Sequence, residues 1–84
     1  MAQHYVYILE SQHDGILYIG YTTNPQERLK RHNQGRSKFT KSHRPWTLIH
    51  LETFPDKSTA LKREKYLKSL KNPNAVKKLI AQSV

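Results

Sequence analysis

The chain has 84 residues, with fifteen lysines and arginines against six aspartates and glutamates, which gives a formal net charge of +9 at pH 7. Because a chain of this length buries only about 60–65% of the surface that its unfolded form exposes, we expect a single domain over residues 1–84 and no second core. No stretch approaches the roughly 18 apolar residues of a membrane-spanning helix.

Several other classes are excluded by composition. Cysteine is absent, which excludes disulfide scaffolds, cysteine-ligated zinc sites and a cysteine nucleophile. The N-terminal residues lack the basic segment, long apolar run and cleavage site of a secretory signal. Three glycines cannot build a glycine-rich phosphate loop. We therefore expect a cytoplasmic protein that does not associate with a membrane.

The charge is distributed unevenly along the chain. Every lysine and arginine lies at or after Arg28, whereas the preceding residues include Glu10 and Asp14. Clustered basic side chains create a field that attracts phosphates, so nucleic acid is the predicted partner. The alternative is a solvated surface that serves only solubility.

Two strands joined by a turn are expected first. Residues 5–9 are aromatic or aliphatic on both alternating faces, which is typical of a strand covered on both sides. The Asp14-Gly15 pair lets the chain reverse, and residues 16–21 form the second strand. If the connecting loop has an even number of residues, Tyr7 and Tyr18 project from the same face of the hairpin.

A helix follows the hairpin. Asn24 is a favourable N-cap, and Pro25 is a favoured first helical residue. The helix is expected to end near Asn33, with Gly35 as the stop signal.

Residues 34–45 are predicted to be a basic loop that contacts a nucleic-acid backbone. Phe39 and Trp46 lie beside this loop and could stack on an unpaired base, although a tryptophan at the start of a strand is more often part of a core. The basic side chains of the predicted interface are Arg36, Lys38, Lys41 and Arg44.

The remaining elements are a strand and two helices. Residues 46–54 alternate like a third strand. A second helix begins near residues 56–58 and continues to about Leu70, and Asn72 with Pro73 starts a short last helix. The predicted order is strand, strand, helix, strand, helix, helix, an α+β fold.

Glu64 is the most informative single residue of the second helix. At 100° per residue it falls within the apolar arc defined by Ala60, Leu61, Leu67 and Leu70. A carboxylate there must become neutral, pair with a cation or bind a metal. The alternative to a functional role is a salt bridge with a nearby lysine or arginine, or a position at the rim of the arc.

Arg28 and His32 are four residues apart and therefore share one face of their helix. Arg28, in the first turn, could direct its guanidinium towards a phosphate. Alternatively, Arg28 belongs to a solvated helix face together with Lys30 and Arg31. The two tyrosines also have an alternative, because tyrosines in strands are more often core residues than catalytic ones. The histidines show no metal-ligand spacing.

Taken together, these residues resemble a known family. The order Tyr5-Val6-Tyr7, Tyr18-Ile19-Gly20, Arg28, His32 and Glu64 is similar to that of the GIY-YIG nuclease superfamily, especially its small stand-alone bacterial members. The likeness covers about residues 4 to 71. It implies a three-stranded antiparallel sheet flanked by helices, with a phosphodiesterase site on one face.

The resemblance also implies roles for individual residues. Tyr18 would be the general base or the phenol that positions water, and Tyr7 would support it. Arg28 would hold the scissile phosphate, and His32 would lie near the nucleophile. Glu64 would be the single carboxylate ligand of a divalent metal, Mg²⁺ or Mn²⁺.

The chain departs from the family pattern at three places. Tyr5 and Val6 replace Gly and Ile in the first motif, as is usual for the small members. Tyr21 stands where repair and homing relatives often carry Lys, and an Asn that larger relatives place after the Glu helix has only Asn72 and Asn74 as candidates.

The leading hypothesis is a Mg²⁺-dependent endonuclease that acts on DNA, with DNA repair as its setting. One alternative is a non-catalytic nucleic-acid-binding module on the same fold. A third hypothesis is a basic adaptor that binds proteins.

Overall fold

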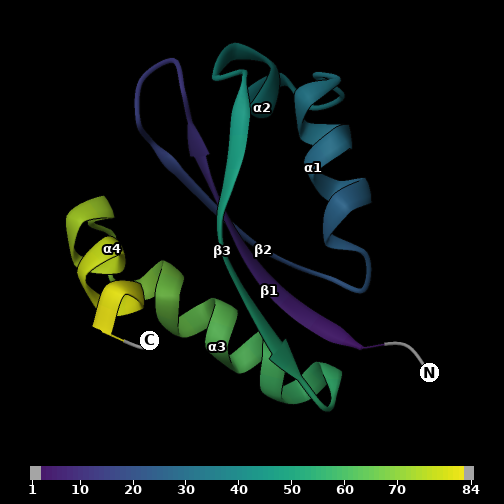
Figure 1. Cartoon of the computed structure of the whole chain (residues 1–84), viewed down its shortest axis with the longest axis vertical. Helices are drawn as coiled ribbons and strands as arrows, with labels where there is room; N and C mark the ends of the chain where they lie inside the picture. Colours follow the sequence, from purple (N-terminus) through teal and green to yellow (C-terminus); the bar gives the residue numbers. More distant parts are fainter. Residues whose placement is uncertain (1–2, 83–84) are drawn as a thin grey trace.

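The computed structural model describes residues 3–82. Within them the chain forms an α+β fold, with one antiparallel sheet in the order β2-β1-β3 and helices on both faces (Figure 1). The elements are β1 (His4–Ser11), β2 (Leu17–Thr22), α1 (Pro25–Asn33), α2 (Lys38–Ser42), β3 (Trp46–Phe54), α3 (Lys57–Ser69) and α4 (Pro73–Gln82).

The predicted strands and the three predicted helices are all present, and α2 is an addition inside the predicted basic loop. Ser37 caps α2 by accepting a hydrogen bond from the amide of Thr40 at 3.2 Å, and the indole of Trp46 donates to the carbonyl of Thr40 at 3.0 Å. Since a helix of five residues is not stable by itself, the contact with β3 supports α2, and the Ser37 cap alone does not predict the helix.

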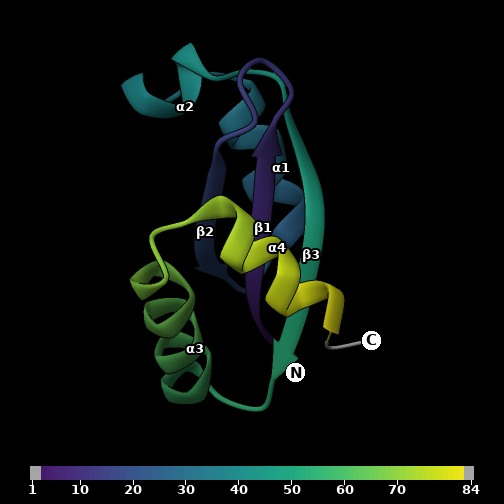
Figure 2. The same ribbon diagram turned by 90° about the vertical axis from the view of Figure 1, so that its left-hand side faces the viewer.

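The two faces of the sheet bury different cores. Val6 and Ile8 of β1 pack with α3 and α4 on one face, where Ala60, Leu67 and Val76 are also buried. The other face carries the second core, which consists of Tyr7, Leu9 and Trp46, with Leu29 of α1 packed against it. Figure 2 shows α1 behind the sheet and α4 in front of it.

The hairpin meets the condition set in the sequence analysis, because the loop between the paired residues Glu10 and Leu17 has an even number of residues. Tyr7 lies opposite Gly20 and Leu9 opposite Tyr18, so the two phenols project from the same face. Gly15 occupies the turn with φ +79°, a conformation that favours glycine. The helix signals that follow are also confirmed, because the Asn24 side chain accepts a hydrogen bond from the amide of Glu27 at the start of α1.

The apolar arc predicted for α3 is wrong at one position. Ala60 and Leu67 are fully buried, but Leu61 is 39% exposed. Glu64 lies at the border of the buried face, and its side chain is 18% exposed. The rim position that the sequence analysis left open is therefore the one observed.

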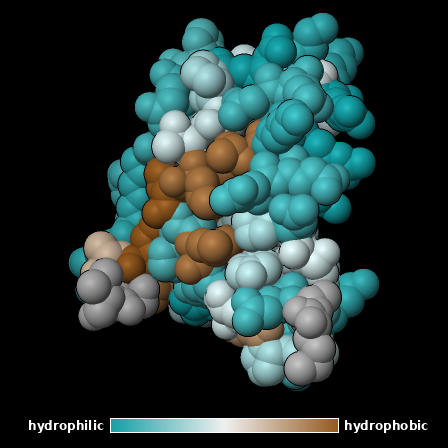
Figure 3. All heavy atoms as spheres, turned by 45° about the vertical axis from the view of Figure 1, so that its right-hand side comes forward, coloured by the Kyte–Doolittle hydropathy of each residue, from teal (hydrophilic) through white to brown (hydrophobic). Residues whose placement is uncertain are grey.

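The surface is mostly hydrophilic. In the face drawn in Figure 3, polar and charged side chains surround one hydrophobic band. Among residues 3–82, no helix has the length and the apolar composition needed to span a bilayer.

Candidate active site

The phenol of Tyr7 lies across the backbone of Gly20 on the neighbouring strand. A Cβ atom built on Gly20 would lie 2.8 Å from Cε1 of Tyr7 and closer still to Cζ and Oη. Such distances are well inside van der Waals contact, so only glycine leaves this path open. The glycine of the Tyr18-Ile19-Gly20 motif therefore decides where the Tyr7 phenol lies.

Tyr7, Tyr18 and His32 form an aromatic cluster between the sheet and α1. The hydroxyl of Tyr7 and Nε2 of His32 share a buried hydrogen bond of 3.1 Å. The rings of Tyr18 and His32 have centroids 4.4 Å apart, and those of Tyr7 and Tyr18 are 6.1 Å apart. Three elements thus bring together three residues that the sequence analysis singled out.

The cluster is electrostatically coupled to Arg28. Burial raises the pKa of the Tyr7 phenol, the neighbouring Tyr18 and Glu64 also raise it, and the charge of Arg28 and its hydrogen bond with the phenol oppose the rise. Burial, followed by the charge of Arg28, lowers the pKa of His32. Tyr7 is therefore protonated and His32 neutral at pH 7.

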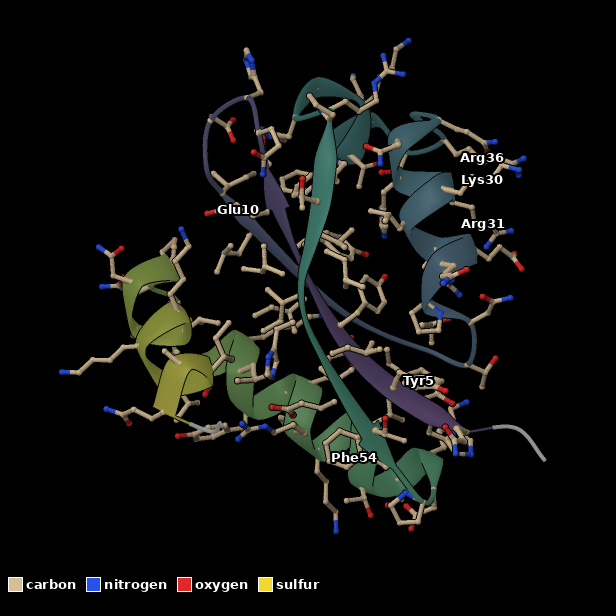
Figure 4. The ribbon with its side chains drawn as sticks, viewed as in Figure 1. Tyr5, Glu10, Lys30, Arg31, Arg36 and Phe54 are labelled. Atoms are coloured by element: carbon tan, nitrogen blue, oxygen red, sulfur yellow. The ribbon has the colours of Figure 1, made fainter. Side chains whose placement is uncertain are left out.

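Arg28 is half-buried and lies one helical turn before His32 on α1. Lys30 and Arg31 of the same helix are exposed and project away from the sheet (Figure 4). Arg28 is thus the arginine of α1 whose guanidinium reaches the aromatic cluster. It does not belong to a fully solvated helix face with Lys30 and Arg31.

Glu64 contributes a negative charge from the other side of the sheet. Its Oε2 lies 3.2 Å from Nζ of Lys68, the residue one turn later on α3. This ion pair is the alternative that the sequence analysis left open. The charge of Glu64 nevertheless reaches the site, because it contributes to the raised pKa of the Tyr7 phenol.

A metal held here would have one protein carboxylate. Within residues 3–82, no group of three or more histidine, cysteine, aspartate or glutamate side chains is placed to enclose an ion. One oxygen ligand fits Mg²⁺ or Mn²⁺ but not zinc, because Mg²⁺ keeps most of its waters and binds through one or two carboxylates plus phosphate oxygens.

The basic residues of the predicted interface are exposed but do not converge on the aromatic cluster. Arg36 projects outward beside Lys30 and Arg31 (Figure 4) and donates a hydrogen bond to the Gln34 side chain. Lys38 and Lys41 lie on α2 with exposed side chains.

Arg44 has a structural role in addition to its charge. Its Nε donates to the carbonyl of Lys41 at 3.1 Å, and Nη1 donates to that of Asn33 at 3.5 Å. The guanidinium also lies against Gly35, where φ is +72°. Arg44 thus links the ends of α1 and α2.

Several residues near the site were missed or left open. Asn33 accepts from the amide of Trp46 at 2.7 Å and donates to its carbonyl at 3.1 Å, which fixes the end of α1 against β3. No local pattern indicates this pairing, since the partners are thirteen residues apart. Trp46 is buried and cannot stack on a base, whereas the Phe39 side chain is 50% exposed.

The departures from the family pattern have structural explanations. Tyr21 packs with the core under α3 and α4, on the face opposite Tyr18, and its hydroxyl shares a 2.8 Å hydrogen bond with His4. Asn72 caps α4 by accepting from the amide of Asn74 at 2.8 Å. Neither position contributes a side chain to the aromatic cluster.

The comparisons with known proteins agree with this geometry. Residues 3–78 match the GIY-YIG catalytic domain. UPF0213 protein SH2523 of Staphylococcus haemolyticus is 44% identical over 78 residues, which cover 92% of this chain and 94% of that protein. UPF0213 protein NP_0776A of Natronomonas pharaonis is 47% identical over 70 residues, covering 82% and 81% of the two chains.

A solved structure gives the same result for the fold. The solution NMR structure of UPF0213 protein BH0048 from Bacillus halodurans superposes with a TM-score of 0.61 at 37% identity, covering 95% of this chain and 84% of that one. Motif order, sheet topology and sequence identity therefore agree, and the chain belongs to the GIY-YIG catalytic-domain family.

Proposed function

We propose that this chain is a divalent-metal-dependent endonuclease that hydrolyses phosphodiester bonds in DNA. The observation that carries the proposal is the packing of Tyr7, Tyr18 and His32 against one another within the electrostatic reach of Arg28. Phosphodiester cleavage needs an oriented water and positive charge where negative charge accumulates. The cluster supplies polar groups for the first requirement, and Arg28 supplies a cation for the second.

The two phenols have different surroundings, which supports different roles. Tyr7 is 1% exposed, hydrogen-bonded to His32 and held protonated by its raised pKa. Tyr18 is half-buried and lines an open groove. Tyr18 is therefore the phenol that can orient or deprotonate a water from solvent, and Tyr7 positions the ring system behind it.

Arg28 and Glu64 are the charged groups of the proposed site. Arg28 would bind the non-bridging oxygens of the scissile phosphate and stabilise the charge that develops on them. Glu64 would hold Mg²⁺ or Mn²⁺, and a bound ion supplies further positive charge at the phosphate. To act as a ligand, the Glu64 carboxylate must be released from Lys68.

The test is a cleavage assay on supercoiled plasmid, single strands and branched DNA, with and without Mg²⁺. Arg28→Ala and Glu64→Gln should each lower the cleavage rate by about 100-fold or more, as loss of a preorganised charged group does. Arg31→Ala is the matched control, because Arg31 lies on the same helix and pairs only weakly with Glu27, at 3.8 Å. Equal rates for all four proteins would contradict the proposal.

The ion pair of Glu64 with Lys68 favours a second candidate, a nucleic-acid-binding module without catalysis. A carboxylate that is already neutralised by a cation of its own helix does not require a metal. This candidate predicts binding that is unchanged by a chelator and no cleavage of any of the DNA substrates.

A further inference from the structure

A groove lies along the open edge of β2. The roles proposed above for the site residues give this groove no function. Its volume is about 420 Å³, and its floor includes Ile16 and Ile19 of the hairpin. Because β2 is an edge strand in the order β2-β1-β3, no further strand from residues 3–82 pairs with it on this side. In Figure 2, α2 lies above β2 on this side, and the connection between α3 and α4 lies beside it.

The groove adjoins the candidate active site. Tyr18, the phenol that reaches solvent, forms part of its wall, and Lys68, which is ion-paired with Glu64, forms another part. A ligand in the groove therefore contacts the proposed catalytic phenol directly. It also lies one side chain away from the proposed metal ligand.

The lining of the groove includes an exposed aromatic ring. Phe39 of α2 lines the groove with a side chain that is 50% exposed. The ring is supported from behind, with its centroid 6.3 Å from that of Tyr18, 4.8 Å from that of His43 and 6.4 Å from that of Trp46. A supported aromatic ring with a free side is the kind of platform on which an unpaired base stacks.

The lining also includes two lysines, and the backbone of one of them is unusual. Lys71 lines the groove directly after α3 and has φ +56°. Among residues 3–82 it is the one non-glycine residue with positive φ. This position after a helix favours glycine, so a lysine here keeps its side chain at the cost of backbone strain. Such strain is typically found at functional positions.

We propose that the groove holds one unpaired nucleotide next to the scissile phosphate, with its base on Phe39 and a backbone phosphate at Lys71. This inference rests on the proposed function and names its substrate class, a single-stranded segment of nucleic acid. A base within a duplex is stacked on both sides and paired, so it cannot turn to face Phe39. The positive charge of Lys68 and Lys71 matches a phosphate backbone that leaves the groove.

The test is the binding of a short fluorescent single strand and of its duplex in chelator, which separates binding from cleavage. Phe39→Ala should weaken single-strand binding about tenfold while changing duplex binding little, and Phe39→Trp should retain binding. Lys71→Gly should lower the slope of log affinity against log salt by about 0.7. Its thermal midpoint should be unchanged or raised, because glycine relieves the strain.

Lys62→Ala is the matched control, since Lys62 is an exposed lysine of α3 that does not line the groove. It should bind both ligands like the wild type. If the wild type binds and cleaves DNA but Phe39→Ala and Lys71→Gly behave like Lys62→Ala, the groove inference is wrong and the proposed function stands. Binding to neither ligand would overturn both, and a dimer that Phe39→Ala abolishes would assign the groove to a second copy of the chain.

Discussion

At Gly20 the absence of a side chain makes room for the phenol of Tyr7. The Tyr7 ring occupies the space that a Cβ atom would need. The Tyr7 hydroxyl also shares a hydrogen bond with His32. A side chain at position 20 that displaced the phenol would therefore also disturb the contact between β1 and α1. The geometry of the cluster therefore depends on having glycine, and not a residue with a Cβ atom, at position 20.

We predict that Gly20→Ala lowers the free energy of unfolding by about 1–3 kcal/mol, the usual cost of overpacking a core. In a Tyr7→Ala background the same change should cost much less, because the phenol that it meets is gone. Urea denaturation of the four proteins of this cycle provides the measurement. Equal costs in both backgrounds would mean that Gly20 does not make room for Tyr7.

The helix α3 is attached to the sheet through a carboxylate of β3. Glu52 of β3 accepts hydrogen bonds from Nε of Arg63 at 2.9 Å and from Nη2 at 3.1 Å, and its Oε2 lies 2.9 Å from Nε2 of His50. Burial raises the pKa of Glu52, but the hydrogen bonds from Arg63 and His50 outweigh it and hold the pKa below 4.5. Since Glu64 is one residue beyond Arg63, this attachment also places the proposed metal ligand.

Arg63→Ala should lower the free energy of unfolding at pH 7 by about 1–2 kcal/mol, the range for hydrogen bonds to a charged group. A carboxyl group whose pKa is lower in the folded than in the unfolded protein stabilises the fold at pH values above its unfolded pKa. This stabilisation is lost as the pH falls through the folded pKa. The difference between variant and wild type should therefore shrink as the pH falls from 5 towards 3.

The control is Arg31→Ala, which removes a weaker and more exposed pair with Glu27 at 3.8 Å. Its expected cost is below about 0.5 kcal/mol at either pH. Denaturation curves at the two pH values compare the variants directly. A constant cost of Arg63→Ala across this range would show that the pairing with Glu52 does not stabilise the fold.

On the scale of the whole molecule, the charge of +9 is divided among distinct surfaces. Arg28 interacts with the aromatic cluster, Lys68 and Lys71 line the groove, and Arg36 projects outward from the segment that follows α1. Lys38 and Lys41 lie on α2 near Phe39 with free side chains. They are therefore the members of the predicted basic interface best placed to contact a nucleic acid that enters the groove.

If Lys38 and Lys41 contact phosphates, Lys38→Ala and Lys41→Ala should each lower the slope of log affinity against log salt by about 0.7–0.9. Arg44 is unsuitable for this test, because its guanidinium bonds to backbone carbonyls and its removal also disturbs the fold. Lys78→Ala on α4 serves as the control. Slopes that match the control would exclude α2 from the interface.

Much of the fold was predictable because its signals are local. An even-numbered loop in the hairpin places Tyr7 and Tyr18 on one face, and the period of 3.6 in a helix aligns Arg28 with His32. The cap at Asn24 marks the start of α1. These features depend on neighbours in the chain, so the residue order contains them.

The rest depended on contacts between distant residues. The helix α2 forms with support from Trp46, and Leu61 is exposed although it fits an apolar arc. Helical periodicity shows on which face of a helix a residue lies. It does not show how wide a part of that face the neighbouring elements cover. The sequence analysis left the ion-pair partner of Glu64 open among the nearby lysines and arginines, and in the structure that partner is Lys68.

The sequence by itself determined the family, the order of the strands and of three helices, and which residues share a face, because motif order and periodicity are properties of the chain. Only the tertiary structure decided which phenol is buried, which one faces the groove, and that Lys71 holds a strained backbone beside it. Burial and electrostatic coupling depend on distances between elements, and those distances exist only once the helices have packed on the sheet.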